Sequence, residues 1–298
     1  METVEQNDKV VCIHFESVTD LMNFKIDKGH KNYKLWMKHG PNTDRHAEDR
    51  WFGKGVTQKD VYRNSLIGWE GGVDILKEKM SLLELGDIVG KGESVTVKKR
   101  KRKKIKDRFG DEIDIHKIYQ GELDKAWKRS IRDVVDSQHH LISIMIDVDC
   151  AARVNANDTL WRAAVAVKLV DALQKAGKSI RIIVGSSSKD VSPETKKIHT
   201  TSIVVKQYNE SLSLDRLAAM SYAGFNRTFN FMAVCYSPYK ISSEMGWVAN
   251  YLKDNAPIQI DDEVNEGHTR YIYLDPVNDI HSAKNSIKQA FEKINKLT

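Results

Sequence analysis

The chain of 298 residues is 41% hydrophobic and 30% charged, which is enough for a sizeable core and typical of a soluble cytosolic protein. No apolar stretch approaches the ~18 residues of a membrane span, and the acidic start of the chain lacks the apolar region of a secretory signal. Cys12, Cys150 and Cys235 are far apart and show no Cys-x-x-Cys spacing, which argues against a disulfide framework or a zinc knuckle. We therefore expect a protein of the cytoplasm.

The first 92 residues contain the patterns of one short strand and three helices. Val10–Phe15 is a short apolar run of strand type, and a helix is expected to begin near Ser17. Thr57 has the residue type of an N-cap for a second helix, which the glycines between positions 68 and 72 end. Helical spacing of apolar residues resumes from Val73 to Leu85.

The next segment, from Lys98 to Arg108, holds nine cations and one acid in eleven positions, a net charge of +8, whereas the whole chain carries +6. Such a run repels itself and cannot be buried, so it is expected where solvent or a polyanion screens it. Phosphate backbones are the commonest partner of such a block because binding releases their condensed counterions. A solvated loop, an acidic protein partner and, in a eukaryotic cell, a nuclear-localisation signal are the alternatives. The nucleic-acid-binding residues that this reading predicts are Lys98, Lys99, Arg100, Lys101, Arg102, Lys103, Lys104, Lys106 and Arg108.

Strand-type alternation flanks the basic segment. Val95 and Val97 alternate with polar residues before it, and Ile113 and Ile115 do so after a turn-forming Phe-Gly-Asp triplet. We therefore expect a β-hairpin or extended arm over residues 93–119, with the cations on a projecting ribbon.

From residue 121 onward, helix and strand patterns alternate. We expect strands at Leu141–Ile146, Ser179–Val184, Thr201–Lys206, Thr228–Tyr236 and Tyr271–Leu274, and helices at Gly121–Val135, at Thr159–Ala176, after Ser213 and at Ile280–Leu297. From Leu141 on, these lengths predict βαβ units and a mainly parallel sheet covered on both faces. The expected fold class is α/β. Residues 138–298 form a three-layer, Rossmann-like domain, and residues 1–137 form an N-terminal α+β region that includes the basic arm.

The carboxyl ends of the strands are where such sheets bind ligands, and Asp147, Asp149 and Ser186–Ser188 are expected there. Two carboxylates two residues apart at a strand end can face one divalent cation. The Asp-Val-Asp motif resembles the first strand of haloacid-dehalogenase-like phosphohydrolases. That resemblance implies Asp147 as nucleophile, Asp149 as general acid/base and Ser186 at the end of the next strand, with Asp261-Asp262 as the later metal pair. No catalytic Lys stands at the matching place.

The same strand end also resembles the von Willebrand factor A-like fold, in which it reads Asp-x-Ser-x-Ser and binds a metal. Asp147 matches the family's Asp, whereas Asp149 and Ala151 replace its two serines. Compared with the family's site, this one then has more negative charge but fewer oxygen ligands, so we expect no tightly bound metal. If a metal did bind, Asp147 and Asp149 would be its candidate ligands. In the alternative reading, these two residues cap the next helix and polarise a loop.

Further pieces of the chain resemble a family of uncharacterised phage-encoded proteins that carry a degenerate von Willebrand A-like domain. The matching pieces are Trp51-Phe52-Gly53, Gly68-Trp69-Glu70-Gly71, Gly110–Ile115, Gly121-Glu122, Trp161–Ala164, Leu169–Gly177 and Ile180–Val184. The resemblance covers most of the chain, and its motifs are structural and not catalytic. The basic run is not a general feature of that family.

The function we expect is that of a non-enzymatic accessory protein, without a cofactor, that binds nucleic acid through the basic arm. Its size and charge pattern resemble a phage early protein that binds single-stranded DNA and recruits a phage RNA polymerase to promoters, which implies these partners and a role in transcription. The alternatives are a metal-dependent phosphohydrolase and a pure protein-interaction module that inhibits a host factor. Aromatic residues between Phe225 and Tyr239 offer a base-stacking platform, although the strand spacing of Phe229 and Phe231 favours core packing for those two.

Overall fold

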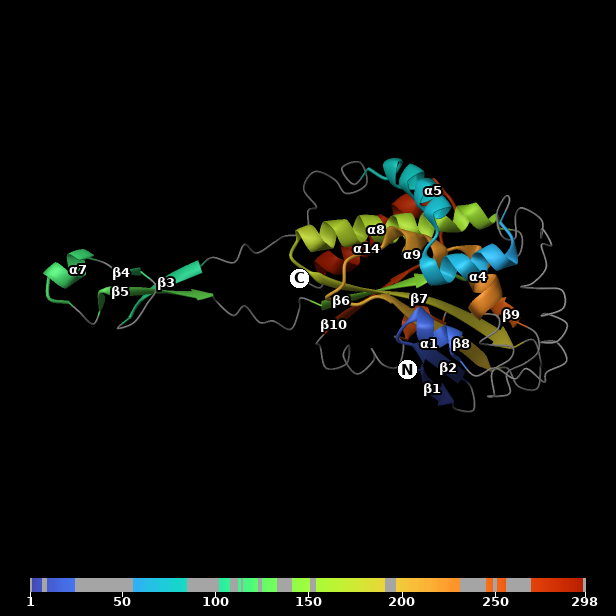
Figure 1. Ribbon diagram of the computed structural model, residues 1–298, viewed down its shortest axis with the longest axis horizontal. Helices are drawn as coiled ribbons and strands as arrows, with labels where there is room; N and C mark the ends of the chain where they lie inside the picture. The colour runs from blue at the N-terminus through green and yellow to red at the C-terminus, as the bar shows by residue number, and fades with distance from the viewer. Residues whose placement is uncertain are drawn as a thin grey trace.

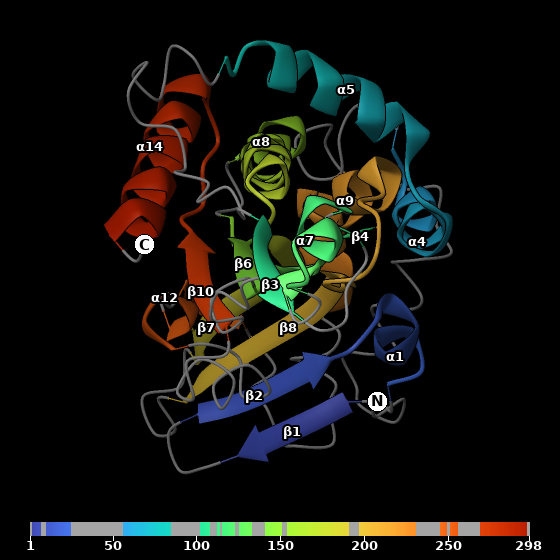
Figure 2. The same cartoon turned by 90° about the vertical axis from the view of Figure 1, so that its left-hand side faces the viewer.

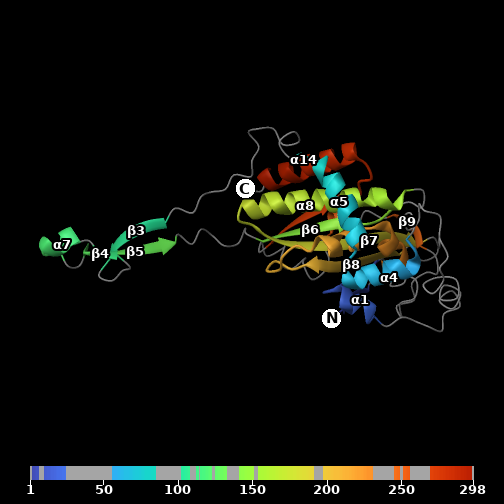
Figure 3. The same ribbon diagram turned by 45° about the horizontal axis from the view of Figure 1, so that its top comes forward.

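The computed structural model describes residues 2–6, 10–24, 56–84, 102–107, 112–113, 115–122, 125–132, 141–150, 154–190, 197–230, 245–248, 251–255 and 269–296. These residues form a large mixed sheet with helices packed on it, and a small three-stranded sheet with one short helix (Figure 1). Figure 3 shows the same separation from a second direction, with the small sheet lying away from the large one. The chain is therefore a mixed α/β protein.

The large sheet contains seven strands. In spatial order they are β1 (Glu2–Gln6), β2 (Val10–Phe15), β8 (Ile198–Lys206), β7 (Ser179–Asp190), β6 (Leu141–Asp147) and β10 (Thr269–Leu274), with β9 (Met245–Val248) paired to β7. From β2 to β10, three of the four neighbouring pairs are parallel, which confirms the mainly parallel sheet that the sequence predicts. The exception is β8, which runs antiparallel to β7.

Strand β6 is buried from Ile142 to Asp147, because side chains cover both faces of the sheet. Ile142, Ile144 and Ile146 belong to the larger core, on the face that carries most of the helices, whereas Met145 belongs to a second, smaller core on the other face. This two-sided burial is the physical reason for the continuous apolar run in the sequence.

Helices cover one face of the large sheet (Figure 2). The helical segments of this part are α1 (Val18–Met22), α4 (Gln58–Ile67), α5 (Glu70–Ser81), a 3-10 turn (Ala156–Thr159), α8 (Leu160–Lys175), α9 (Leu214–Met220), α10 (Ala223–Phe225), a π-helical turn (Asn226–Asn230), α12 (Tyr251–Asp254) and α14 (Ile280–Lys296). Helix α8 packs on β6 and β7, with α5 over it and α14 beside it, and α14 also packs on β10 (Figure 2). This surrounding explains why the α8 sequence is apolar on nearly all sides. Gly177, with a φ of 73°, ends it.

Helix α12 lies on the opposite face, where Leu252 joins Met145, Ile183 and Tyr273 in the second core. Gly185 of β7 permits this approach. A Cβ atom there would lie 2.8 Å from Leu252 and 2.7 Å from the Met145 sulfur, closer than ordinary side chains pack.

The N-terminal strands belong to the same sheet as β6 and β7. Strand β2 pairs in parallel with β8, from Val10 opposite Ile198 to Phe15 opposite Ile203, and His14 shares a 2.7 Å hydrogen bond with Ser202. Val11, Ile13 and Phe15 are buried in the main core. The sheet therefore extends across the boundary that the sequence suggests at residues 137 and 138.

The small sheet consists of β3 (Arg102–Asp107), β5 (Trp127–Arg132) and β4 (Glu112–Ile113), in that order, with α7 (Ile115–Tyr119) beside it. Two sequence-based predictions are wrong here. The hairpin form expected within residues 93–119 is wrong, because β3 and β4 do not pair with one another and each pairs with β5. The cations of β3 nevertheless lie on a projecting ribbon, as the other form of that prediction has it (Figure 1). Residues 127–132 are a strand and not part of a helix, because Trp127, Arg129 and Ile131 also fit strand alternation and β3 supplies a pairing partner.

Three further predictions need correction. Ile115 begins a helix and does not continue strand alternation. Strand β7 continues through the serines to Asp190, because β8 pairs with it as far as Lys189. The sequence predicts a strand that begins at Thr228, but Thr228 to Asn230 belong to the π-helical turn. Phe229 of this turn packs on Phe225 with ring centres 5.3 Å apart. Residues 231–236 lie outside the described part of the chain.

Candidate functional site

The predicted nucleic-acid-binding residues fall partly on a regular strand. Arg102, Lys103, Lys104 and Lys106 are four of the six residues of β3, which pairs antiparallel with β5. Lys98, Lys99, Arg100, Lys101 and Arg108 lie outside the described residues. The structure therefore places the described cations of the run on one strand of a ribbon.

Strand β5 adds Lys128, Arg129 and Arg132 to this ribbon. Together β3 and β5 contain seven cationic residues and one acidic residue, a net charge of +6 that equals the net charge of the whole chain. Sequence reasoning missed the three cations of β5 because it assigned them to a helix. The signal was present as three basic residues in the five positions from Lys128 to Arg132.

Helix α7 follows β4 and carries exposed apolar side chains. Tyr119 is 86% exposed, Ile115 60% and Ile118 41%. Lys117 donates a 2.7 Å hydrogen bond to Glu122, so this cation is already paired. An exposed aromatic ring close in the chain to a basic ribbon is suited to stacking on a base.

Asp147 and Asp149, at the carboxyl end of β6, are buried and internally hydrogen-bonded. One Asp149 oxygen accepts from the Ser186 hydroxyl at 2.6 Å, and the other accepts from the Ser187 N–H at 2.7 Å. The Asp147 carboxylate accepts from the Asp149 N–H at 2.7 Å and from the Tyr273 hydroxyl. Asp147 and Asp149 lie at the carboxyl end of β6 as predicted, and Ser186 contacts Asp149, although Ser186 lies inside β7 and not at its end. Neither aspartate caps the next helical turn, because Asn155 is its N-cap.

Arg162 of α8 lies beneath this pair with 1% of its surface exposed. Its guanidinium donates to the Asp147 carbonyl oxygen at 3.0 Å, to the Val277 carbonyl oxygen at 3.3 Å and to the Asn278 side chain at 3.0 Å. One guanidinium thus ties β6 to the segment after β10. Its positive charge compensates part of the negative charge of the two carboxyl groups.

Burial changes the protonation of this cluster. The pKa of Asp149 is raised well above its usual value by burial and by the neighbouring Asp147 charge. Burial also raises the pKa of Asp147, although the hydrogen bond from Tyr273 acts in the opposite direction. Two neighbouring buried carboxyl groups do not both ionise readily, so the pair loses its protons at higher pH than exposed aspartates do. Burial raises the pKa of the Cys150 thiol as well, which disfavours a reactive thiolate.

A metal centre has little support in this arrangement. Each carboxylate already accepts two hydrogen bonds from internal donors, and the described residues contain no group of three or more His, Cys, Asp and Glu placed to hold an ion. Ala151 and the Asp261-Asp262 pair, which the two family resemblances involve, lie outside the described residues. The arrangement is suited to bracing β6 against β7 and β10.

The aromatic platform is not exposed where the structure describes it. Phe225 and Phe229 are buried in the main core, and Arg227 donates to the Val154 carbonyl oxygen at 3.2 Å. Phe231, Tyr236 and Tyr239 lie outside the described residues. The expected core role of Phe229 is therefore confirmed, although in a helical turn.

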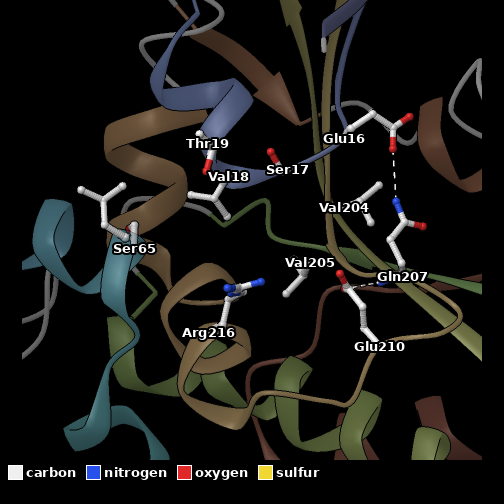
Figure 4. Close-up of a pocket in the computed structure, with 11 residues that line it drawn as sticks. Glu16, Ser17, Val18, Thr19, Ser65, Val204, Val205, Gln207, Glu210 and Arg216 are labelled. Carbon is white, nitrogen blue, oxygen red and sulfur yellow. Dashed lines mark hydrogen bonds between the residues drawn. The ribbon is translucent and has the colours of Figure 1, made fainter.

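A small pocket of about 110 Å³ lies between α1, α4, β8 and the start of α9 (Figure 4). Arg216 lines it beside Val205, and Gln207 donates to Glu16 at 3.2 Å and to Glu210 at 2.8 Å. Ligand pockets usually enclose at least about 300 Å³. We assign no ligand to this pocket.

These features define a mixed α/β protein that carries a separate basic ribbon. The model of the family described as Domain of unknown function (DUF7192) matches residues 2–298, and the chain belongs to that family. No curated protein and no solved structure matches the chain. In the described part of the chain, every helix is too short or too polar to cross a membrane.

Proposed function

We propose that the protein is a non-enzymatic accessory protein that binds nucleic acid, single-stranded DNA in particular, through the ribbon of β3 and β5. The observation that carries this proposal is the concentration of charge, because these two strands hold a net +6 and the remaining residues sum to zero. A phosphate backbone supplies the counter-charge, and release of its condensed ions drives the association.

The large sheet is proposed to be von Willebrand A-like and to serve as a rigid platform. The parallel arrangement of β7, β6 and β10 and the aspartates at the end of β6 support that assignment. The burial of Asp147 and Asp149 supports a structural role over the phosphohydrolase alternative, because a nucleophile must reach its substrate. Recruitment of a phage RNA polymerase rests on the sequence resemblance alone and stays a prediction.

Titration of a labelled single-stranded oligonucleotide at ~50 and ~200 mM salt tests the proposal. With about five to seven phosphates neutralised at a slope of roughly −0.7 each, affinity should fall by about 100- to 1,000-fold over this range. Replacing Arg102, Lys103, Lys104 and Lys106 by Gln should reduce the slope by about half.

The matched control replaces four exposed lysines of the helices by Gln: Lys59, Lys77, Lys288 and Lys293. This variant has the same net charge as the ribbon variant. Equal loss of affinity in both variants, or full affinity in the ribbon variant, would contradict the proposal. Heparin competition without preference for nucleic acid would favour an acidic protein partner. Magnesium-dependent turnover of an aryl phosphate that Asp147→Asn abolishes would favour the enzyme.

A further inference from the structure

The register of the small sheet divides the basic ribbon into two unlike faces. Arg102 lies opposite Arg132, Lys104 opposite Ser130 and Lys106 opposite Lys128. Residues that are directly opposite in an antiparallel pair share a face, and alternate positions along each strand share it too. These six positions therefore form one face of the ribbon.

The other face consists of the intervening positions, where Lys103 lies opposite Ile131, Ile105 opposite Arg129 and Asp107 opposite Trp127. This face contains two cations, one acid, two isoleucines and a tryptophan, and β4 adds Ile113 beside Trp127. The first face contains five cations and one serine, and β4 adds Glu112 beside Lys128. Over the three strands, the first face carries a net charge of +4 and the other face a net charge of +1.

We propose that the nucleic-acid site is the first face alone, formed by Arg102, Lys104 and Lys106 of β3 together with Lys128 and Arg132 of β5. The inference rests on the proposed function and assigns Lys128 and Arg132, which lie outside the basic run, to the binding site. The ligand is the phosphodiester backbone of one strand that lies along the ribbon.

The dimensions of a β-ribbon suit this ligand. Positions 102 and 106 are four residues apart, so they are separated by about 14 Å at the ~3.4 Å rise of an antiparallel strand. A helically stacked nucleic-acid strand presents a phosphate about every 3.4 Å, so four to five phosphates span the same length. The five cations of the face thus correspond to about five phosphates, and a log-log salt slope near −3.5 is expected.

Two double variants with the same net charge test the assignment. Lys128→Gln with Arg132→Gln removes two cations from the proposed face, and Lys103→Gln with Arg129→Gln removes two from the other face. At ~0.1 M salt each lost phosphate contact weakens binding about fivefold, so the first variant should bind about 25-fold more weakly than wild type, with its slope reduced in magnitude by about 1.4. The second should lose less than about threefold. Thermal unfolding and two-dimensional NMR spectra establish that both retain the fold.

The outcomes separate this inference from the proposed function. If the wild-type chain binds in a salt-dependent way but the two variants lose affinity equally, net charge alone matters and the face assignment is overturned. A larger loss in the Lys103 and Arg129 variant overturns it as well. Absence of oligonucleotide binding by the wild-type chain overturns both the proposed function and the inference.

Discussion

Asp149→Asn should keep or raise the stability of the protein at pH 8, whereas Asp149→Ala should lower it, although both remove the same ionisable group. An asparagine can keep both contacts, since its oxygen accepts from the Ser187 N–H and its amide donates to the Ser186 hydroxyl, which can also accept. An alanine leaves the Ser187 N–H without an acceptor and opens a small cavity. We expect this loss to lower the free energy of unfolding by about 2–4 kcal/mol.

The wild-type carboxyl group should also make stability depend on pH. The pKa of Asp149 is ~3.9 in an unfolded chain and well above that in the fold, so the folded chain retains a proton that the unfolded chain has lost. Its contribution is fully present below pH ~3.9 and is lost as the pH rises through the folded pKa. Within that window the free energy of unfolding falls by up to about 1.4 kcal/mol per pH unit. Carboxylates with a lowered pKa, such as Asp60 beside Thr57, act below this window.

Urea unfolding of the three proteins at several pH values from 5 to 8 measures both effects. Asp149→Asn should have a flatter pH profile than wild type and should equal or exceed its stability at pH 8, because the charge that burial penalises is gone. Asp149→Ala should have the same flatter pH profile, with a lower free energy of unfolding at every pH. Equal destabilisation by Asn and Ala at every pH would refute the hydrogen-bond exchange. A pH slope that neither variant changes would refute the raised pKa of Asp149.

Three other predictions concern packing, metal binding and strand preference. Gly72→Ala should destabilise the protein by about 1–3 kcal/mol in thermal unfolding because its Cβ would overlap the Trp69 ring, whereas Gly71→Ala on the same helix, 3.2 Å from that ring, should be near neutral. Magnesium at ~1 mM should leave the melting temperature unchanged, although a ~10 μM site would add about 2.7 kcal/mol; an upward shift that Asp147→Ala abolishes would reveal a metal site. Tyr119→Ala should weaken single-stranded DNA binding by about 1–3 kcal/mol and leave duplex binding unchanged in fluorescence titrations, and equal loss for both would exclude base stacking.

The central fold was predictable where the signals are local. The apolar run Leu141–Ile146 is a strand buried on both faces, and the helix that Gly177 ends has the expected extent to within a residue at each end. Thr57 and Ser213 cap helices as expected, and the helix expected near Ser17 begins there with Ser17 as its N-cap, because an N-cap depends on the next three residues. Such features need no knowledge of distant parts of the chain.

The errors occurred where distant pairing decides between two local readings. Trp127 and Ile131 are four residues apart, which fits a helix face, and they also fit a strand with Arg129 between them; the pairing with β3 selects the strand. The position of Asp149 at the sheet edge was predictable, but its contacts with Ser186 and Ser187 depend on residues more than 35 positions away. Burial of a carboxylate is a property of that packing, so its raised pKa could not be read from the motif.

The two charged features of the molecule differ in what a ligand must displace. At the carboxyl edge, a ligand that replaces the hydrogen bonds from Ser186, Ser187 and Tyr273 leaves these buried donors to be satisfied, and each costs about 1–3 kcal/mol unless it finds a new partner. That total is comparable to the whole binding free energy of a micromolar ligand, about 8 kcal/mol. A strand of nucleic acid on the ribbon instead releases counterions. This comparison supports the proposal that the ribbon is the binding surface, whereas the hydrogen bonds of Asp147 and Asp149 hold β6 to β7 and β10.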